Sequence, residues 1–214
     1  MPDGPLSLPA RLTLLAWDAD PSRQAPAVRA GALAELARRG LLIDDDGIAT
    51  PRDLDSRTGD PVLDGLLELV SESRPHRWRV WVTLRARYTL DAVREQLVAE
   101  GVLRAEKHRV LGVFPSVEHV LADTARADAL RREAHRILAG SAPVEGVPEP
   151  TATLLALAAA AGLPSAPDGS SRDGRAETLA HRAGAVAPAF AAVLRELCSE
   201  LRDEAPPASL VRSR

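Results

Sequence analysis

Residues 28–43 read VRAGALAELARRGLLI. Apolar residues recur three to five positions apart in this stretch, which predicts a helix with one buried face: Val28, Ala32, Leu33, Leu36 and Ala37. Its charged residues fall mainly on the other faces: Arg29, Glu35, Arg38 and Arg39. Gly40 is expected to end the helix, because glycine adopts the left-handed conformation of a helix C-cap at little cost. The apolar run after Gly40, the turn at Asp45-Asp46-Gly47 and the segment Ile48-Ala49-Thr50 predict a small hairpin.

Composition favours an all-α protein. Hydrophobic residues make up 45 % of the 214-residue chain, yet aromatic residues make up only 3 %. Alanine-rich sequence suits helices that pack closely through small side chains, whereas a β-sandwich needs more β-branched and aromatic residues. We expect a chain that is mostly helical, with two hairpins. A single domain is expected over residues 1–204, with a flexible loop at residues 163–174 and a frayed tail at residues 205–214.

Further elements follow from periodicity and from helix-ending residues. Residues 6–17 predict a first amphipathic helix, and the prolines at 21 and 26 predict a loop over residues 18–27. Pro61 suits the first position of a helix over residues 62–73, and Thr89 is a candidate cap for a helix that ends at Gly101. Ser116 or Asp123 is expected to start the next helical region. The remaining predictions are a linker at 140–150, a buried helix at 151–161, and a helical region at 175–204 that breaks near Gly184 and Pro188.

Charge and cysteine content limit the classes of function. The formal net charge of −3 argues against a protein built mainly to coat nucleic acid, so an anion site would be a local patch. Lys107 is the only lysine among 27 basic residues, which indicates a GC-rich genome. We expect that genome to be bacterial. Cys198 is the only cysteine, which excludes an intramolecular disulfide, and its leucine neighbours predict a buried thiol. No signal peptide and no membrane-spanning window is evident, so we expect a cytoplasmic protein, peripheral at most at the inner face of a membrane.

The sequence offers no coherent case for catalysis, and we expect no enzyme activity, no cofactor and no metal site. The five histidines form no ligand-spaced pair, and no glycine-rich phosphate loop or GxSxG motif occurs. The run from Asp44 to Gly47 is too short for an EF-hand loop and is better explained as a solvated turn.

Residues 74–88, RPHRWRVWVTLRARY, combine five arginines with Trp78, Trp81 and Tyr88. Arginine can hold a phosphate bidentately, and an indole can lie at a lipid headgroup boundary or stack on a base. The alternative is that the two tryptophans, three residues apart, anchor a helix in the core while the arginines stay in water. The sequence leaves both interpretations open.

Residues 102–114, VLRAEKHRVLGVF, predict a second hairpin that Pro115 closes. Its apolar residues lie beside Lys107, His108 and Arg109, a pattern that suits shallow insertion into an anionic membrane surface. A hairpin folded back onto the core would explain the same pattern.

A different class of function is a winged-helix nucleic-acid-binding protein. A helix, a glycine and a hairpin follow one another at residues 28–50 and again at residues 90–114. Arg29, Arg38 and Arg39 could meet phosphates in such a layout. The net acidic charge and the lack of a base-reading cluster make nucleic acid an unlikely partner.

Four stretches together resemble the Golgi phosphoprotein three family, the phosphoinositide-binding peripheral proteins of the Golgi, which has bacterial members. The first is residues 29–41, with the pattern R-x-x-x-L-x-E-L-x-x-R-G, and the second is TGDPVLDGLL at residues 58–67. The third is VREQLVAEGVLRAEK at residues 93–107, and the fourth is the C-terminal half, with LLALAAAAGL and APAFAAVLREL in the family's order. The resemblance spans about residues 6–201.

The resemblance implies an all-α fold, with a central apolar helical bundle surrounded by amphipathic helices and with an apolar β-hairpin. It also implies a membrane-facing pocket for phosphatidylinositol 4-phosphate or a similar anionic headgroup. Arg29 matches one headgroup arginine, and an ungapped alignment places Arg87 on a second. The third falls on Leu90, where Arg94 or Arg85 could substitute. The position of the family's pocket tryptophan falls in residues 19–27, which hold no aromatic residue. On the hairpin, the resemblance implies membrane contact by Val110, Leu111, Val113 and Phe114.

The partner expected from these observations is an anionic phospholipid membrane surface. A scaffold that retains only the fold and binds protein partners is the remaining alternative, and a homo-oligomer stays open.

Overall fold

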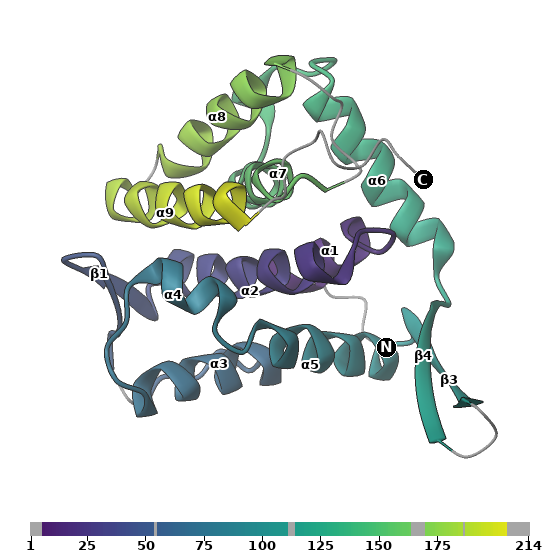
Figure 1. Cartoon of the computed structure of the whole chain (residues 1–214). Coiled ribbons are helices and arrows are strands. Elements are labelled where there is room, and N and C mark those ends of the chain that lie inside the picture. The colour runs from purple at the N-terminus through teal and green to yellow at the C-terminus, as the bar shows by residue number, and fades with distance from the viewer. Residues whose placement is uncertain (1–5, 54, 111–113, 164–169, 186, 205–214) are drawn as a thin grey trace.

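The computed structural model describes residues 6–53, 55–110, 114–163, 170–185 and 187–204. Helices dominate this part of the chain, and two antiparallel hairpins complete it (Figure 1). In chain order the elements are α1 (Leu8–Leu15), α2 (Pro21–Arg38), β1 (Leu42–Asp45), β2 (Ile48–Pro51), α3 (Pro61–Glu72), α4 (Trp78–Thr83), α5 (Ala86–Ala99), β3 (Leu103–Val110), β4 (Phe114–Leu121), α6 (Thr124–Leu138), the 3₁₀ turn η1 (Val144–Gly146), α7 (Glu149–Ala160), α8 (Ser170–Gly184) and α9 (Pro188–Glu204).

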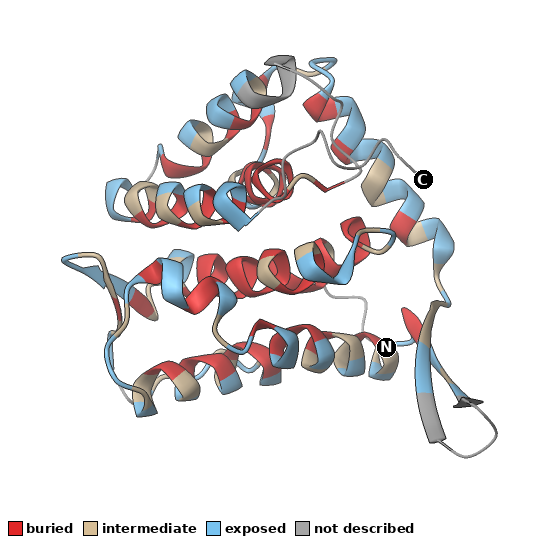
Figure 2. Ribbon diagram, in the orientation of Figure 1, coloured by how far each residue is buried: buried red, intermediate tan, exposed pale blue. Residues whose placement is uncertain are grey.

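Two central helices, α2 and α7, are buried on nearly every side. All residues of α2 from 27 to 36 and all residues of α7 from 152 to 160 are buried. In Figure 1, α1 and α2 form a middle layer between α3 and α5 on one side and α7, α8 and α9 on the other, and α6 runs along one end. The outer helices are buried only on their inner faces (Figure 2). This arrangement confirms the predicted all-α fold, with a central apolar bundle inside amphipathic helices.

Helix α2 begins seven residues before the predicted start, so the loop predicted over residues 18–27 was wrong. The Asp20 carboxylate accepts a hydrogen bond from the Ser22 amide, and Pro21 takes the first helical position. Pro26 lies inside the helix, in its second turn, and so removes the hydrogen bond that residue 26 would otherwise donate to the Ser22 carbonyl. The predicted end at Gly40 is confirmed, since Gly40 has φ +69° and the Leu41 amide donates to the Leu36 carbonyl.

The hairpin predicted after Gly40 is present as β1 and β2. Asp45 pairs with Ile48 across the turn, and Asp46 and Gly47 have φ values of 50° and 83°. Two successive residues with positive φ are typical of the tight turns that join antiparallel strands.

The basic and aromatic segment of residues 74–88 forms α4 and the start of α5. Both tryptophans have no exposed surface, which confirms that they anchor the core, and their arginine neighbours are exposed. The indole Nε1 of Trp78 donates to Asp44 Oδ1 at 2.7 Å. Thr89 does not cap α5, because the helix starts earlier, at Ala86, after Arg85 reverses the chain with φ 54°.

The second hairpin extends further along the chain than predicted. Strand β3 pairs with β4 from Leu103 opposite Leu121 to Val110 opposite Phe114. Pro115 therefore lies within β4, opposite Arg109, and does not close the hairpin. A two-stranded ribbon has only edge strands, where proline is tolerated. Asp123 caps α6 by accepting a hydrogen bond from the Arg126 amide, as predicted, whereas Ser116 lies in β4.

The C-terminal part follows the predicted pattern with one correction. Helix α7 is buried as expected. The C-terminal helical region is divided into α8, which ends at Gly184, and α9, which begins at Pro188. The loop predicted for residues 163–174 is too long at its C-terminal end, since α8 begins at Ser170. Leu163, at its other end, lies outside the helices and is buried. Residues 164–169 and the predicted tail at 205–214 lie outside the described residues.

Candidate functional site

Arg29 lies inside the molecule, at the junction of α4 and α5. Helix α2 carries it, and its side chain is only 1 % exposed because α2 is surrounded by other helices. One terminal nitrogen, Nη2, donates to the carbonyls of Leu84 at 3.0 Å and of Arg85 at 2.7 Å. Nε and Nη1 are buried and have no hydrogen-bond partner among the described residues. Burial lowers the pKa of the Arg29 guanidinium from 12.5 to about 10.

The start of α5 lies directly beside this guanidinium. Leu84 and Arg85 are the last two residues before the helix, and no side chain caps its first turn. No acidic residue lies in that turn. The first amides of a helix lack partners within the helix and carry a partial positive charge, so they favour an anion. A buried cation, a first turn without a side-chain cap and the absence of acidic residues in that turn together make this a locally positive place in a net acidic chain.

The surface around the start of α5 is cationic and carries one aromatic side chain. Arg85 and Arg87 are exposed, and Arg87 forms no hydrogen bond or ion pair with any residue that the structure describes. Tyr88 is 74 % exposed, the largest value among the exposed large hydrophobic residues of the described chain. Sequence reasoning counted Tyr88 with the two tryptophans, but only Tyr88 lies at the surface.

Arg94 lies two helical turns further along α5 and is held in a different way. It donates to Gln24 Oε1 at 2.6 Å, and Gln24 donates in turn to the carbonyls of Ala16 and Trp17. Burial lowers the pKa of Arg94, and nearby Arg87 lowers it further while Asp91 acts in the opposite direction. The structure therefore brings Arg29 and Arg87 to the start of α5, while Arg94 ties α5 to the end of α1. Leu90, the position matched to a third headgroup arginine, is buried in the core.

The β3–β4 hairpin stands away from the helical body (Figure 1). Its base joins the core, where Leu103 of β3 is buried and Leu121 of β4 packs against the buried cluster. Beyond the base the strands extend away from the helices and do not fold back onto them, the alternative that the sequence left open (Figure 1). Val117, on the second strand, is 53 % exposed. Of the predicted membrane-contact residues, Val110 and Phe114 form the last described backbone pair, and Leu111 and Val113 lie outside the described residues.

The winged-helix interpretation requires an exposed recognition helix after residue 28. Helix α2 instead lies in the core, and its Arg29 points to the α4–α5 junction. Helix α5 does have an exposed face, but acidic and basic residues are mixed on it: Arg87, Asp91 and Glu95. Neither helix presents a surface suited to a DNA groove.

The described residues form neither a cluster that could hold a metal ion nor a reactive thiol. No three histidine, cysteine, aspartate or glutamate side chains gather closely enough there to hold a metal ion. Cys198 is buried, and burial raises the pKa of its thiol to about 12, which removes the thiolate needed for reactivity. None of the described helices combines the length and hydrophobicity needed to cross a bilayer.

Comparison with known proteins identifies the family. No curated protein matches the chain. A family model, Golgi phosphoprotein 3 (GPP34), matches residues 8–197, from the start of α1 into α9. That match covers every element described above except the end of α9. The chain therefore belongs to the Golgi phosphoprotein 3 (GPP34) family.

Proposed function

We propose that this protein is a non-enzymatic, peripheral membrane protein that binds the headgroup of an anionic phospholipid at the start of α5. Phosphatidylinositol 4-phosphate, or a lipid of similar headgroup charge, is the proposed ligand. The observation that carries the proposal is the buried Arg29 guanidinium, which lies beside the uncapped first turn of α5 with two nitrogens unpartnered among the described residues. Family membership is consistent with this function.

The contacts suggest an order of events. Arg87 is exposed and unpaired within the described chain, so it makes the first contact with the phosphate. Arg29 is 1 % exposed, so a headgroup reaches it only when the α4–α5 junction opens. Nη2 already holds the Leu84 and Arg85 carbonyls, which leaves Nε and Nη1 as the donors for phosphate. These two groups lie on different edges of the guanidinium, so each would donate a separate charge-assisted hydrogen bond to a phosphate oxygen.

An apolar contact with the membrane supplements the cationic contact with the headgroup. Tyr88, next to Arg87, is placed to lie at the headgroup level, where aromatic side chains with a polar end are favoured. The apolar hairpin residues Val110, Leu111, Val113 and Phe114 are proposed to insert into the same leaflet. A single weak membrane contact gives only marginal binding, so stable attachment needs both the cationic and the apolar contact. The proposed location is the cytoplasmic, inner face of a membrane.

Vesicle co-sedimentation tests the proposal. The full chain is mixed with vesicles of phosphatidylcholine alone, or of phosphatidylcholine with phosphatidylserine, phosphatidylinositol or phosphatidylinositol 4-phosphate. We expect binding to increase with headgroup phosphorylation and to weaken with salt, since salt screens the cationic contact. Arg87→Gln should reduce this binding without lowering stability, and Leu111→Asp with Val113→Asp should reduce it on all anionic vesicles.

Arg195→Gln is the matched control, because Arg195 is an exposed arginine on α9 and its loss changes the net charge equally. Equal effects of Arg87→Gln and Arg195→Gln would show generic attraction between charges. The absence of binding to every vesicle at low salt would refute the proposal.

A further inference from the structure

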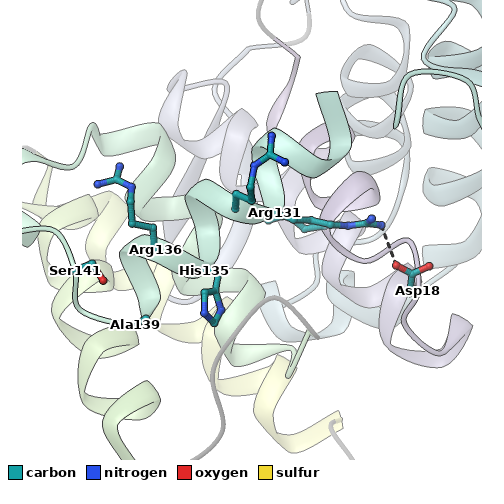
Figure 3. A pocket seen from close by; sticks show the side chains of 8 residues that line it. Asp18, Arg131, His135, Arg136, Ala139 and Ser141 are labelled. Carbon is teal, nitrogen blue, oxygen red and sulfur yellow. Dashed lines mark ion pairs between the residues drawn. The ribbon is translucent and has the colours of Figure 1, made fainter. Parts of the chain in front are cut away.

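An open groove lies between the end of α1 and α6, and it shares no residue with the proposed membrane site. Its volume is about 590 Å³. The end of α1 and the turn after it contribute Leu15 and Asp18, and the other side is formed by α6 and the turn that follows (Figure 3): Arg131, Arg132, His135, Arg136, Ala139 and Ser141. One acidic side chain thus faces three arginines and a histidine.

The acidic groups near this groove already have partners. Arg131 reaches across to Asp18, with the two charged groups 3.0 Å apart (Figure 3). It also pairs with Asp128 at 3.5 Å. The other acid of this part of α6, Glu133, interacts with Arg11 of α1: burial lowers the pKa of Arg11, and Glu133 acts in the opposite direction. Arg132 and Arg136 form no ion pair or hydrogen bond with the described residues, and both are exposed.

Their placement brings like charges together. Residues four apart on a helix are surface neighbours, so Arg132 lies beside Arg136 and Arg131 lies beside His135. Like charges at this spacing destabilise a helix. His135 and Arg136 lie in the last turn of α6, where the partial negative charge of the helix end stabilises a cation. Arg132 lies a turn earlier and gains little from this stabilisation. The acids at this spacing, Asp128 beside Arg132 and Glu133 beside Arg136, already interact with Arg131 and Arg11. The helix therefore presents a net positive charge to the groove.

We propose that this groove binds a small organic phosphate. The phosphate lies between Arg132 and Arg136, where two guanidinium groups can hold its oxygens and relieve their mutual repulsion. The organic part extends along Leu15 and Ala139, because the groove is far larger than a phosphate ion and lies within the usual volume range of small-molecule sites. Two sources share this chemistry, a soluble phosphate ester and the headgroup of a phospholipid.

Nuclear magnetic resonance titration of the full chain tests the site. The probes are sn-glycerol 3-phosphate and inorganic pyrophosphate, added to wild type, to Arg132→Gln/Arg136→Gln and to the control Arg195→Gln/Arg202→Gln. The control removes two exposed arginines of α9 and changes the net charge equally. We expect saturable shifts of the backbone amides of α6 and Ser141 in wild type and in the control. The groove variant should bind about tenfold more weakly or worse, because each charged hydrogen bond to phosphate is strong.

Two results would overturn the proposal: no saturable shift around the groove with either probe, or equal weakening in the groove variant and the control. Vesicles of phosphatidylcholine with phosphatidic acid then distinguish the two sources. If only the groove variant loses vesicle binding, the phosphate belongs to a lipid; if the soluble probes bind and vesicle binding is unchanged, it belongs to a soluble ester. Arg87→Gln separates this site from the proposed function, since it should leave the shifts around the groove intact.

Discussion

Replacing Arg29 by methionine should change the stability of the protein little, although Arg29 is among its largest buried side chains. The change removes hydrogen bonds from Nη2 to two carbonyls, and bonds to a charged group contribute about 1.5–3 kcal/mol each. It also removes a buried cation. The fall in the pKa of Arg29 from 12.5 to about 10 corresponds to a burial penalty of about 3 kcal/mol. The two effects largely offset each other, so the free energy of unfolding should fall by no more than about 3 kcal/mol.

Arg29→Ala provides the comparison. It loses the same hydrogen bonds and the same charge, but it also loses the packing of the side-chain stem and leaves a cavity. Truncation of a large buried side chain to alanine costs about 2–5 kcal/mol. We therefore expect Arg29→Ala to be clearly less stable than Arg29→Met.

Urea unfolding followed by circular dichroism measures both differences. The folded-state pKa of Arg29 is lower than its unfolded value, so the burial penalty is present at every pH below about 10. The difference between wild type and Arg29→Met should therefore be the same at about pH 6 and about pH 9. If Arg29→Met lowers the free energy of unfolding by clearly more than about 3 kcal/mol, the hydrogen bonds outweigh the burial penalty. Arg29 would then be an anchor of the α4–α5 junction, and the reasoning for a binding role would fail.

Three further predictions concern the packing of the helices. Burial alone would raise the pKa of Glu35, but hydrogen bonds from Arg39 and the Leu8 amide, together with nearby Arg38, hold it below its usual value. Glu35→Gln should thus cost about 2 kcal/mol at neutral pH, and the difference from wild type should shrink as the pH falls below about 4; a constant difference in urea unfolding would contradict this. Gly184→Ala should lower stability by about 1–3 kcal/mol, because the new Cβ would meet Ala191 and lie 2.9 Å from its Cα; an unchanged melting temperature would contradict it. Cys198 should react with a disulfide reagent such as dithionitrobenzoate only after unfolding, because the thiol is buried and its pKa is raised to about 12; rapid reaction of the native protein would contradict this.

Local chemistry made much of the fold predictable. Gly40, Pro61 and Asp123 each stand at a helix boundary that the sequence indicated, because capping depends on the residue and its immediate neighbours. The boundaries that were missed depend on more than composition. Two prolines five residues apart suggest a loop when the sequence is read alone. Pro21, however, takes the first position of α2, where proline is favoured, and α2 continues through Pro26.

The candidate site was harder to predict, because exposure depends on neighbours that are distant in sequence. Periodicity placed Arg29 and Glu35 on the polar faces of an amphipathic helix, but other helices cover α2 on every side, and both residues are buried. One signal was available: between residues 27 and 36, every residue except those two is alanine, glycine, leucine or valine. The family resemblance singled out Arg87, which the structure shows exposed at the start of α5, while the exposure of Tyr88 required the structure.

The central position of α2 has a consequence for how the chain acquires its structure during synthesis. Helix α2 contacts α3, α4 and α5, which follow it closely, but it also contacts α7 and α9 from the other end of the chain. Until the ribosome has released those later helices, the side of α2 that they cover stays exposed as an apolar surface. The N-terminal half is therefore the part of this protein that we expect to need protection by a chaperone, and translation through α9 is the step that ends that need.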